Sequence, residues 1–212
     1  MVAALLFDLD GTLIDSRALV ARASIEALRQ GAGLTVPVEE IEHTLSWTVT
    51  DRFRKFAPGR GRDLIELYTR LYTANVATAR PFPGVLEMLG VLRDRKIACA
   101  VVTSRRRATA GPALRTHGLV PFFQAVICEE DVAAPKPAPD PVLAASARLG
   151  VPPRDTSMIG DSDLDMQSGR AAGARTGAAL WGSSERDALL ASGPDYILET
   201  PGDVVAKLIG GT

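Results

Sequence analysis

Residues 4–12 read Ala-Leu-Leu-Phe-Asp-Leu-Asp-Gly-Thr, an apolar run that ends abruptly in two acids, Asp8 and Asp10. Residues 3–7 have the length and composition of a short buried strand, and the acids mark its end. More β-rich runs follow, with helical patterns between them, and this alternation predicts an α/β fold, a doubly wound parallel sheet with helices on both faces. The clear runs are residues 97–102, 125–128 and 156–159, the weaker ones 174–180 and 196–198, and the helical patterns 85–93, 108–117, 139–149 and 163–172.

One long stretch breaks this alternation. Between residues 16 and 80 there is no convincing strand, and a structureless loop of that length would be unusual in a compact domain. We therefore expect an all-helical cap over residues 16–80, inserted into an α/β core formed by residues 1–15 and 81–212. The expected cap helices are residues 18–30, 38–45, 48–56 and 63–79, with glycine-containing turns at 31–33 and 58–61.

The bulk composition sets limits on the class of protein. The chain has 212 residues, 46% of them hydrophobic and 23% charged, with a formal net charge of −1. These values fit one large domain, or one domain with a smaller insertion. Arg105-Arg106-Arg107 is the only strongly basic run, so we expect no nucleic-acid partner. A monomer is the default expectation for a protein of this size.

Membrane and secretory signals are also missing from the pattern. No segment is apolar over a length that would span a bilayer, and the N-terminal run lacks the basic start of a signal peptide. Cys99 and Cys128 lie in apolar segments without metal-like spacing, which favours buried free thiols in a reducing compartment. We therefore expect a cytoplasmic protein without a membrane partner.

Polar side chains that can carry chemistry follow four of the predicted strands. In a parallel sheet, ligands bind beyond the carboxyl ends of the strands, so residues that directly follow different strands meet at one edge. We expect such a cluster here. Its members are Asp8 and Asp10 after the first strand, Thr103 and Ser104 after the second, Lys136 after the third, and Asp161, Asp163 and Asp165 after the fourth.

Several carboxylates forced into one crevice repel each other, and a divalent cation relieves the repulsion. Ligands that are all oxygen select a hard ion, and Mg²⁺ is the best match. Lys136 adds a second positive charge, so the crevice can hold a dianion such as a phosphate monoester. The Thr103 hydroxyl and the backbone N–H groups after Asp8 can bind the remaining phosphate oxygens.

Calcium is the rival metal, because the segment from Asp161 to Asp165 imitates the start of an EF-hand loop. The sixth position of that loop is Met166 rather than Gly, and the twelfth is Ala172 rather than Glu. The segment that starts at Asp8 has Leu19 in its twelfth position. An EF-hand is therefore rejected.

These segments resemble, in order, the four motifs of the haloacid dehalogenase superfamily, and the resemblance covers essentially the whole chain. The motifs are Asp8-Leu9-Asp10-Gly11-Thr12, Thr103-Ser104, Lys136-Pro137 and Gly160-Asp161-Ser162-Asp163-Leu164-Asp165. The helical insertion is similar to the family's mobile cap. In general pattern the chain is most similar to the phosphoglycolate phosphatase-like and pyrophosphatase-like members.

The resemblance implies a role for each motif residue. Asp8 would attack phosphorus and become an aspartyl-phosphate, and Asp10 would protonate the leaving oxygen and then activate water. Mg²⁺ would bind the Asp8 and Asp161 carboxylates and the Asp10 backbone carbonyl. Thr103, Ser104 and Lys136 would bind the phosphoryl group, and Asp165 would orient Lys136 or a metal-bound water. Arg17 and Arg105 are possible contacts to the substrate.

The predicted reaction is hydrolysis of a small phosphorylated metabolite, a phosphomonoester. The second acid, Asp10, argues against dehalogenation, and Lys55 is a weak candidate for the cap lysine of phosphonate-cleaving relatives. An inorganic pyrophosphatase or a phosphosugar mutase on the same machinery stays open, although residues 16–20 lack the histidine typical of the mutase cap. A non-catalytic regulatory protein that binds Mg²⁺ or phosphate is the alternative from another class, and no missing motif acid favours it.

Other prominent side chains have ordinary structural interpretations. Arg52 and Arg54 could reach the distal part of a substrate, but each is expected at the surface. The remaining expectations are packing for Trp47, Phe53 and Trp181 and a surface position for His43 and His117.

Overall fold

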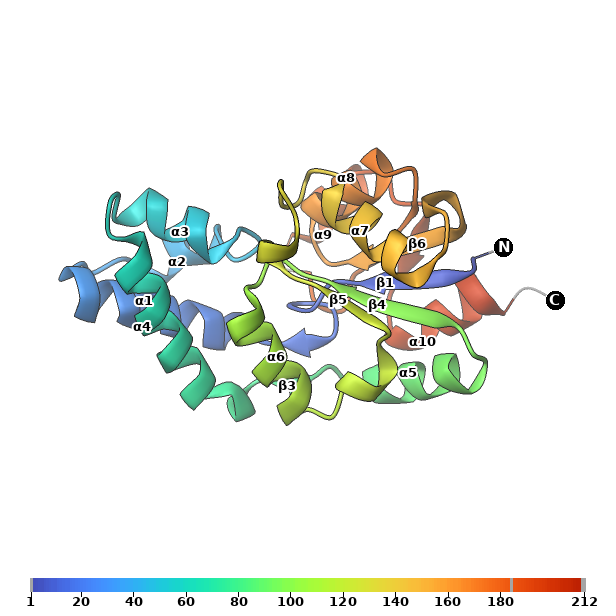
Figure 1. The fold of residues 1–212 in the computed structure, drawn as a ribbon, viewed down its shortest axis with the longest axis horizontal. Helices are drawn as coiled ribbons and strands as arrows, with labels where there is room; N and C mark the ends of the chain where they lie inside the picture. The colour runs from blue at the N-terminus through green and yellow to red at the C-terminus, as the bar shows by residue number, and fades with distance from the viewer. Residues whose placement is uncertain (1, 184, 211–212) are drawn as a thin grey trace.

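The structure, a computed structural model, describes residues 2–183 and 185–210, so the outer bounds of the expected core, residues 1 and 212, lie outside it (Figure 1). Its largest sheet has six parallel strands in the order β5-β4-β1-β6-β7-β8. All six coincide with the predicted runs to within one residue at each end, and the doubly wound α/β fold is confirmed. The strands are β1 (Ala4–Phe7), β4 (Ala98–Val102), β5 (Ala125–Ile127), β6 (Thr156–Gly160), β7 (Arg175–Ala179) and β8 (Tyr196–Leu198).

Helices cover both faces of this sheet (Figure 1). α5 (Val85–Asp94) and α10 (Pro201–Val204) contact each other on one face, and α7 (Asp140–Leu149) and α8 (Asp163–Ala171) lie on the other. The central strand β1 is buried along its whole length. Leu5 and Phe7 pack in one apolar cluster and Leu6 in a second, because successive side chains of a strand point to opposite faces. With both faces apolar, polar groups are left to the strand ends.

Four of the helices between β1 and β4 pack against each other at the end of the molecule away from both chain termini (Figure 1). They are α1 (Arg17–Ala32), α2 (Val38–Glu42), α3 (Val49–Phe56) and α4 (Gly61–Ala74). Leu28 of α1 and Leu64 of α4 are fully buried in this layer. Phe53 is buried as expected, and its ring meets that of Tyr68 edge to face with centroids 6.0 Å apart.

The structure differs from the prediction in short segments, where too few residues are present to show a periodic pattern of apolar side chains. Two two-residue strands, β2 (Ile14–Asp15) and β3 (Arg80–Pro81), pair antiparallel where the helical segment begins and ends. The predicted helix 63–79 is divided, because α4 ends at Ala74 and a 3₁₀ turn, η1 (Val76–Thr78), follows. The remaining elements are α6 (Arg107–Thr116), α9 (Arg186–Ala191), the 3₁₀ turns η2 (Val120–Phe122), η3 (Glu129–Asp131) and η4 (Pro153–Asp155), and a π-helical turn, η5 (Val205–Ile209).

Two further expectations concern the cysteines and membrane-spanning segments. Cys99 and Cys128 are buried free thiols, as predicted. Among the described helices, none has both the length and the apolar character needed to cross a bilayer.

Candidate active site

The predicted side chains meet at the carboxyl ends of the central strands. Asp8 directly follows β1, Thr103 follows β4, and Asp161 follows β6, while Lys136 comes from the loop after β5. All four side chains are buried. They line one cavity of about 50 Å³, large enough for only a few water molecules. Asp10, Ser104 and Arg105 also line it from the core, and Arg17, Trp47 and Arg52 line it from the helical segment.

The turn after β1 brings this chain segment against Asp161. Gly11 has a φ of +78°, and a Cβ there would lie 2.1 Å from Asp161 Oδ2. A side chain at this position would therefore be strained and would displace the carboxylate. The neighbouring Thr12 hydroxyl donates to Asp161 Oδ1 at 3.3 Å, and Trp181 Nε1 donates to the Thr12 carbonyl at 2.9 Å. Trp181 thus packs on the turn, as expected.

Lys136 bridges two of the carboxylates. Its Nζ donates to Asp8 Oδ1 at 2.7 Å, to Asp165 Oδ1 at 2.5 Å and to the Val102 carbonyl at 3.3 Å. The other oxygen of Asp165 accepts from the backbone N–H and hydroxyl of Ser162, at 3.2 and 2.6 Å, in the capping box that starts α8. The fold therefore holds Asp165 from both sides and uses it to position Lys136.

Burial has the largest effect on the pKa values of Asp8 and Asp161. Burial raises the pKa of Asp8 to about 7, although Lys136 opposes the shift. Burial, with Asp8 as the next cause, also raises the pKa of Asp161 well above its ordinary value. For Lys136, burial opposes the charged ammonium, but Asp165 and Asp8 outweigh it and raise the pKa of the lysine. The cluster therefore has more negative charge than Lys136 alone can stabilise.

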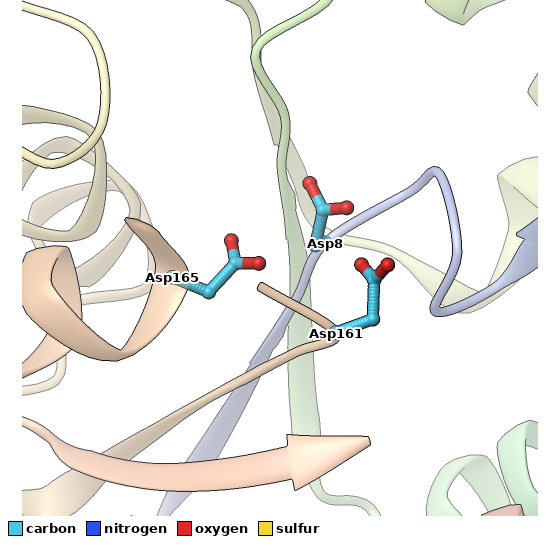
Figure 2. Close-up of side chains that lie close together, drawn as sticks. All are labelled: Asp8, Asp161 and Asp165. Atoms are coloured by element: carbon cyan, nitrogen blue, oxygen red, sulfur yellow. The ribbon is translucent and has the colours of Figure 1, made fainter. Parts of the chain in front are cut away.

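These acids fit a divalent metal. Asp8, Asp161 and Asp165 each offer a carboxylate oxygen within 4.8 Å of those of the other two (Figure 2). Because both oxygens of Asp165 already accept hydrogen bonds, Asp8 and Asp161 are the carboxylates with capacity for a metal. Oxygen donors and excess negative charge match a hard cation.

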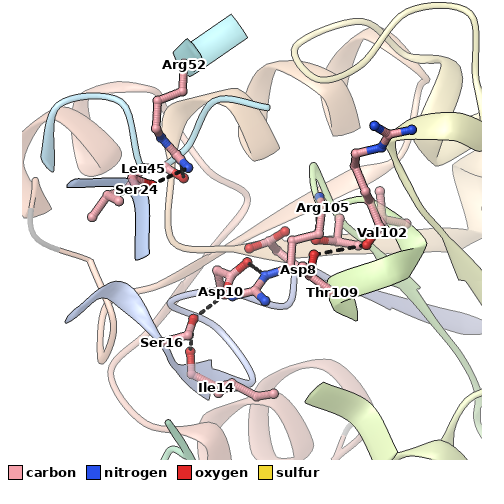
Figure 3. A network of polar contacts seen from close by, with 12 residues as sticks. Asp8, Asp10, Ile14, Ser16, Ser24, Leu45, Arg52, Val102, Arg105 and Thr109 are labelled. Carbon is pink, nitrogen blue, oxygen red and sulfur yellow. Dashed lines mark hydrogen bonds and ion pairs between the residues drawn. The ribbon is translucent and has the colours of Figure 1, made fainter. Parts of the chain in front are cut away.

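Asp10 lies beside the cluster in a different set of contacts (Figure 3). Its carboxylate is paired with the Arg105 guanidinium through Nε and Nη2, and it accepts from the Ser16 hydroxyl. Arg105 is only 7% exposed, and its guanidinium carbon lies 4.1 Å from the ring centroid of Tyr72 on α4. Arg105 therefore lines the cavity while it binds an acid from the motif after β1.

Some candidate residues lie elsewhere than expected. Arg52 is only 2% exposed, so its predicted surface position is wrong, because Thr44 and Ser24 supply buried hydrogen-bond acceptors for its guanidinium. Trp47 is 40% exposed and lines the cavity, so the prediction that it packs in the core is also wrong. Both errors concern the degree of burial, which depends on how the helices pack and which local sequence does not encode.

The other candidates are placed as follows. Arg17 Nη1 lies 3.9 Å from Asp161 Oδ2 and lines the cavity. Ser104 is half-buried on the same wall, whereas Asp163 is exposed and outside the cavity. Arg54 and His43 are exposed as predicted, and His117 is half-buried rather than at the surface.

Buried acids that could hold a metal ion and a buried lysine, at the carboxyl end of a doubly wound sheet and next to a helical segment, are features of a class of α/β hydrolases. A family model described as haloacid dehalogenase-like hydrolase matches residues 5–179, and the chain belongs to that family. The chain is thus an enzyme, a phosphatase of the haloacid dehalogenase type. The family generally uses a divalent metal, with which the buried acids are compatible.

Individual relatives agree with this assignment. Pyrophosphatase PpaX of Bacillus pumilus (strain SAFR-032) is 34% identical over 202 residues, covering 95% of this chain and 94% of the relative. Pyrophosphatase PpaX of Oceanobacillus iheyensis (strain DSM 14371) is 34% identical over 204 residues, again 95% and 94% of the two chains. The crystal structure of a hydrolase from Pseudomonas syringae matches with a TM-score of 0.87 and 25% identity, and covers 99% of each chain.

Proposed function

We propose that the protein is a Mg²⁺-dependent phosphatase that hydrolyses a small phosphorylated metabolite, a phosphomonoester, through an aspartyl-phosphate on Asp8. One observation carries the proposal. The Asp8 carboxylate lies at the cavity, with Lys136 Nζ at 2.7 Å on one side and Asp161 close enough on the other to share a metal. This position supports the proposal that Asp8 acts as the nucleophile toward a phosphoryl group bound in the cavity.

In the first step, a carboxylate oxygen of Asp8 forms a bond to phosphorus while the bond from phosphorus to the leaving oxygen breaks. Asp10 gives a proton to that leaving oxygen, and in the second step it takes a proton from the water that attacks the aspartyl-phosphate. Orthophosphate and free Asp8 result. The carboxylates of Asp8 and Asp161 and the Asp10 backbone carbonyl would hold Mg²⁺, which would neutralise charge on the phosphoryl group.

Thr103, Ser104 and Lys136 would hold the phosphoryl oxygens. Thr103 Oγ1 accepts from the backbone N–H of Arg105 at 3.1 Å, and this leaves its hydroxyl proton free to donate. Lys136 uses all three of its protons, and the contact to the Val102 carbonyl is the longest at 3.3 Å. We expect a phosphoryl oxygen to take the place of that carbonyl.

The proposal includes residues 16–80 as a mobile cap. Residues of this segment line the same cavity as the motif residues, so closure over the substrate would exclude bulk water from the aspartyl-phosphate. We also propose that the protein is a cytoplasmic monomer. The two buried free thiols support the cytoplasmic location, because thiols stay reduced in that compartment.

Inorganic pyrophosphate is the second candidate substrate. Two relatives at 34% identity are named pyrophosphatase PpaX, and the cavity of about 50 Å³ favours compact molecules. Hydrolysis would use the same steps, with orthophosphate as the leaving group. Because the mechanism would be the same for both substrates, a comparison of their kcat/KM values decides which one the enzyme prefers.

The test is phosphate release from pyrophosphate, phenyl phosphate and a set of sugar phosphates, with Mg²⁺ and with EDTA. We expect Mg²⁺-dependent turnover in the wild type and a loss of more than about 10³-fold in Asp8→Asn, since the nucleophile is removed. Asp163→Asn is the matched control, because Asp163 is an exposed acid outside the cavity. Turnover that survives Asp8→Asn or EDTA at the wild-type rate would disprove the proposal.

A further inference from the structure

The loop that follows β7 lies against the metal site and has no role in the steps above. β1, β6 and β7 are consecutive neighbours in the sheet, so the segments after them meet at one edge. The segment after β1 carries Asp8 and the turn from Asp10 to Thr12, and Asp161 follows β6 with its carboxylate close to that of Asp8 (Figure 2). The segment after β7 contains Trp181 and Gly182. The topology therefore brings these two residues beside the segments that would hold Mg²⁺.

The first contact between the loop and the turn is a hydrogen bond from Trp181. Its indole Nε1 donates to the Thr12 carbonyl at 2.9 Å, and its ring packs against the apolar cluster that contains Phe7. The preceding residue, Leu180, donates its backbone N–H to the Leu198 carbonyl at 2.9 Å, which ties the loop to β8. Trp181 itself does not line the catalytic cavity. Any effect of Trp181 on the site must therefore pass through the turn.

The second contact is a close approach of two backbones. A Cβ on Gly182 would lie 1.7 Å from the carbonyl oxygen of Gly11 and 2.6 Å from the carbonyl carbon. The φ of Gly182 is not positive, so lack of space rather than backbone strain excludes a side chain there. Backbone atoms cannot swing aside as the end of a flexible side chain can. Any larger residue in place of Gly182 would therefore push the turn or the loop out of position.

The turn in turn fixes Asp161. The Thr12 hydroxyl donates to Asp161 Oδ1 at 3.3 Å, and Gly11 leaves room for Oδ2, which a Cβ at Gly11 would meet at 2.1 Å. Arg17 Nη1 also approaches Oδ2, at 3.9 Å. The turn begins with Asp10, whose backbone carbonyl is the third protein ligand of the Mg²⁺ site proposed above. A shift of the turn would therefore move one ligand of that site and loosen another.

Firmly placed ligands matter more to Mg²⁺ than to Ca²⁺. Mg²⁺ is the smaller ion and needs nearly octahedral geometry with short ligand distances, whereas Ca²⁺ accepts irregular sets of oxygens at longer distances. Selectivity between the two ions therefore depends on how rigidly the protein holds its ligands. Residues that orient a ligand from outside the site can change this selectivity without touching the ion.

We propose that Trp181 and Gly182 are positioning residues, which hold the turn from Asp10 to Thr12 so that the metal site prefers Mg²⁺ to Ca²⁺. The inference rests on the ligand set of the proposed function and adds the source of its ion selectivity. Without the indole donor, or with a methyl group at Gly182, the turn can leave the position that the octahedral geometry needs. Ca²⁺ tolerates such a shift better than Mg²⁺ does.

The test is calorimetric titration of the substrate-free protein with Mg²⁺ and, separately, with Ca²⁺. Trp181→Phe removes the indole donor and keeps an aromatic ring, and Gly182→Ala adds the methyl group for which the Gly11 carbonyl leaves no room. We expect Trp181→Phe to weaken Mg²⁺ binding roughly 5- to 10-fold, the scale of one lost hydrogen bond, and Ca²⁺ binding less than about twofold. Gly182→Ala should lower the ratio of Mg²⁺ affinity to Ca²⁺ affinity at least as much.

Two variants serve as matched controls. Tyr196→Phe removes the hydroxyl that accepts from Arg175 Nη1 at 2.9 Å, so it deletes one hydrogen bond of a half-buried aromatic residue on β8. Gly90→Ala adds a methyl group on α5, where a Cβ would meet open space. A general loss of stability would affect the binding of both ions alike. Each control should therefore keep the ratio of the two affinities within about twofold of the wild type.

The ratio of affinities decides the proposal. A fall of more than about twofold in both Trp181→Phe and Gly182→Ala supports it, and a wild-type ratio within about twofold in either folded variant overturns it. If one of the two variants does not fold, the other decides. Failure of the proposed metal site would look different, because the wild type would then not bind Mg²⁺ or Asp161→Asn would bind it equally well. That result would overturn both proposals, whereas an unchanged ratio alone overturns only the role of Trp181 and Gly182.

Discussion

Replacing Lys136 by Met removes the buried cation that contacts Asp8 and Asp165 and keeps an unbranched apolar side chain in its place. The two ion pairs that are lost, at 2.7 and 2.5 Å, are both buried. Removing one partner of a buried pair costs about 3–5 kcal/mol, because the other partner keeps its desolvation penalty without its counter-charge. For a chain of this size, a loss of 1 kcal/mol lowers Tm by roughly 2–4 °C, so the predicted change is roughly 6–20 °C.

The substitution should also change the protonation of the nucleophile. Burial raises the pKa of Asp8 to about 7, and the charge of Lys136 limits this rise. Removing Lys136 should therefore raise the pKa of Asp8 further. Less of the carboxylate is then ionised at neutral pH, and turnover falls. The loss of stability should shrink as the pH is lowered, because a protonated Asp8 needs no counter-charge.

Thermal unfolding of Lys136→Met at pH 5 and pH 8 is the assay. Lys207→Met is the matched control, because Lys207 forms an exposed ion pair with Asp203 at 3.2 Å and its loss should cost less than about 1 kcal/mol. Equal changes in Tm for the two variants at pH 8, or a larger loss for Lys136→Met at pH 5 than at pH 8, would refute the reasoning.

Three further predictions concern the metal site and its turn. Mg²⁺ at 100 times its Kd should stabilise the wild type by about 2.7 kcal/mol, and a shift of the same size in Asp161→Asn would contradict the assignment of that ligand. In the metal-free protein, the free energy of unfolding should fall as pH rises from about 4 to about 7. Between the ordinary pKa of 3.8 and the folded value of about 7, the native state holds the proton of Asp8 that the unfolded chain has lost. Urea unfolding with EDTA at pH 5 and pH 8 measures this, and higher stability at pH 8 would count against it. Gly11→Ala should lower turnover far more than Gly59→Ala. The two glycines have similar φ angles of +78° and +81°, but only a Cβ at Gly11 would meet Asp161, at 2.1 Å from Oδ2. Equal turnover in the two variants would mean that the turn does not position Asp161.

The positions of the motif residues follow from short-range sequence signals. Asp8, Thr103 and Asp161 each come directly after an apolar strand, and the parallel topology brings the strand ends to one edge whatever the details of packing. The same argument places Lys136 in the loop after β5. This part of the site could be predicted because each residue needs only its own strand to be assigned correctly.

The helical segment could not be predicted to the same depth. Arg52 is buried because Ser24 and Thr44 accept its hydrogen bonds, and Ser24 belongs to another helix, 28 positions earlier in the chain. The pair between Arg105 and Asp10 joins residues 95 positions apart, and an arginine at the start of a helix is ordinarily solvated. Such burial depends on how helices pack, which the local pattern of polar and apolar residues does not determine.

The central claim, that Asp8 is the nucleophile, is tested most directly by trapping the aspartyl-phosphate. The enzyme is mixed with Mg²⁺ and excess substrate, quenched in acid within one turnover, digested and analysed by peptide mass spectrometry. We predict one added phosphoryl group on the peptide that contains Asp8, and none on the same peptide from Asp8→Asn. A phosphoryl group on a different residue, or an unmodified Asp8 peptide at a time when phosphate release has shown a burst, would contradict the account.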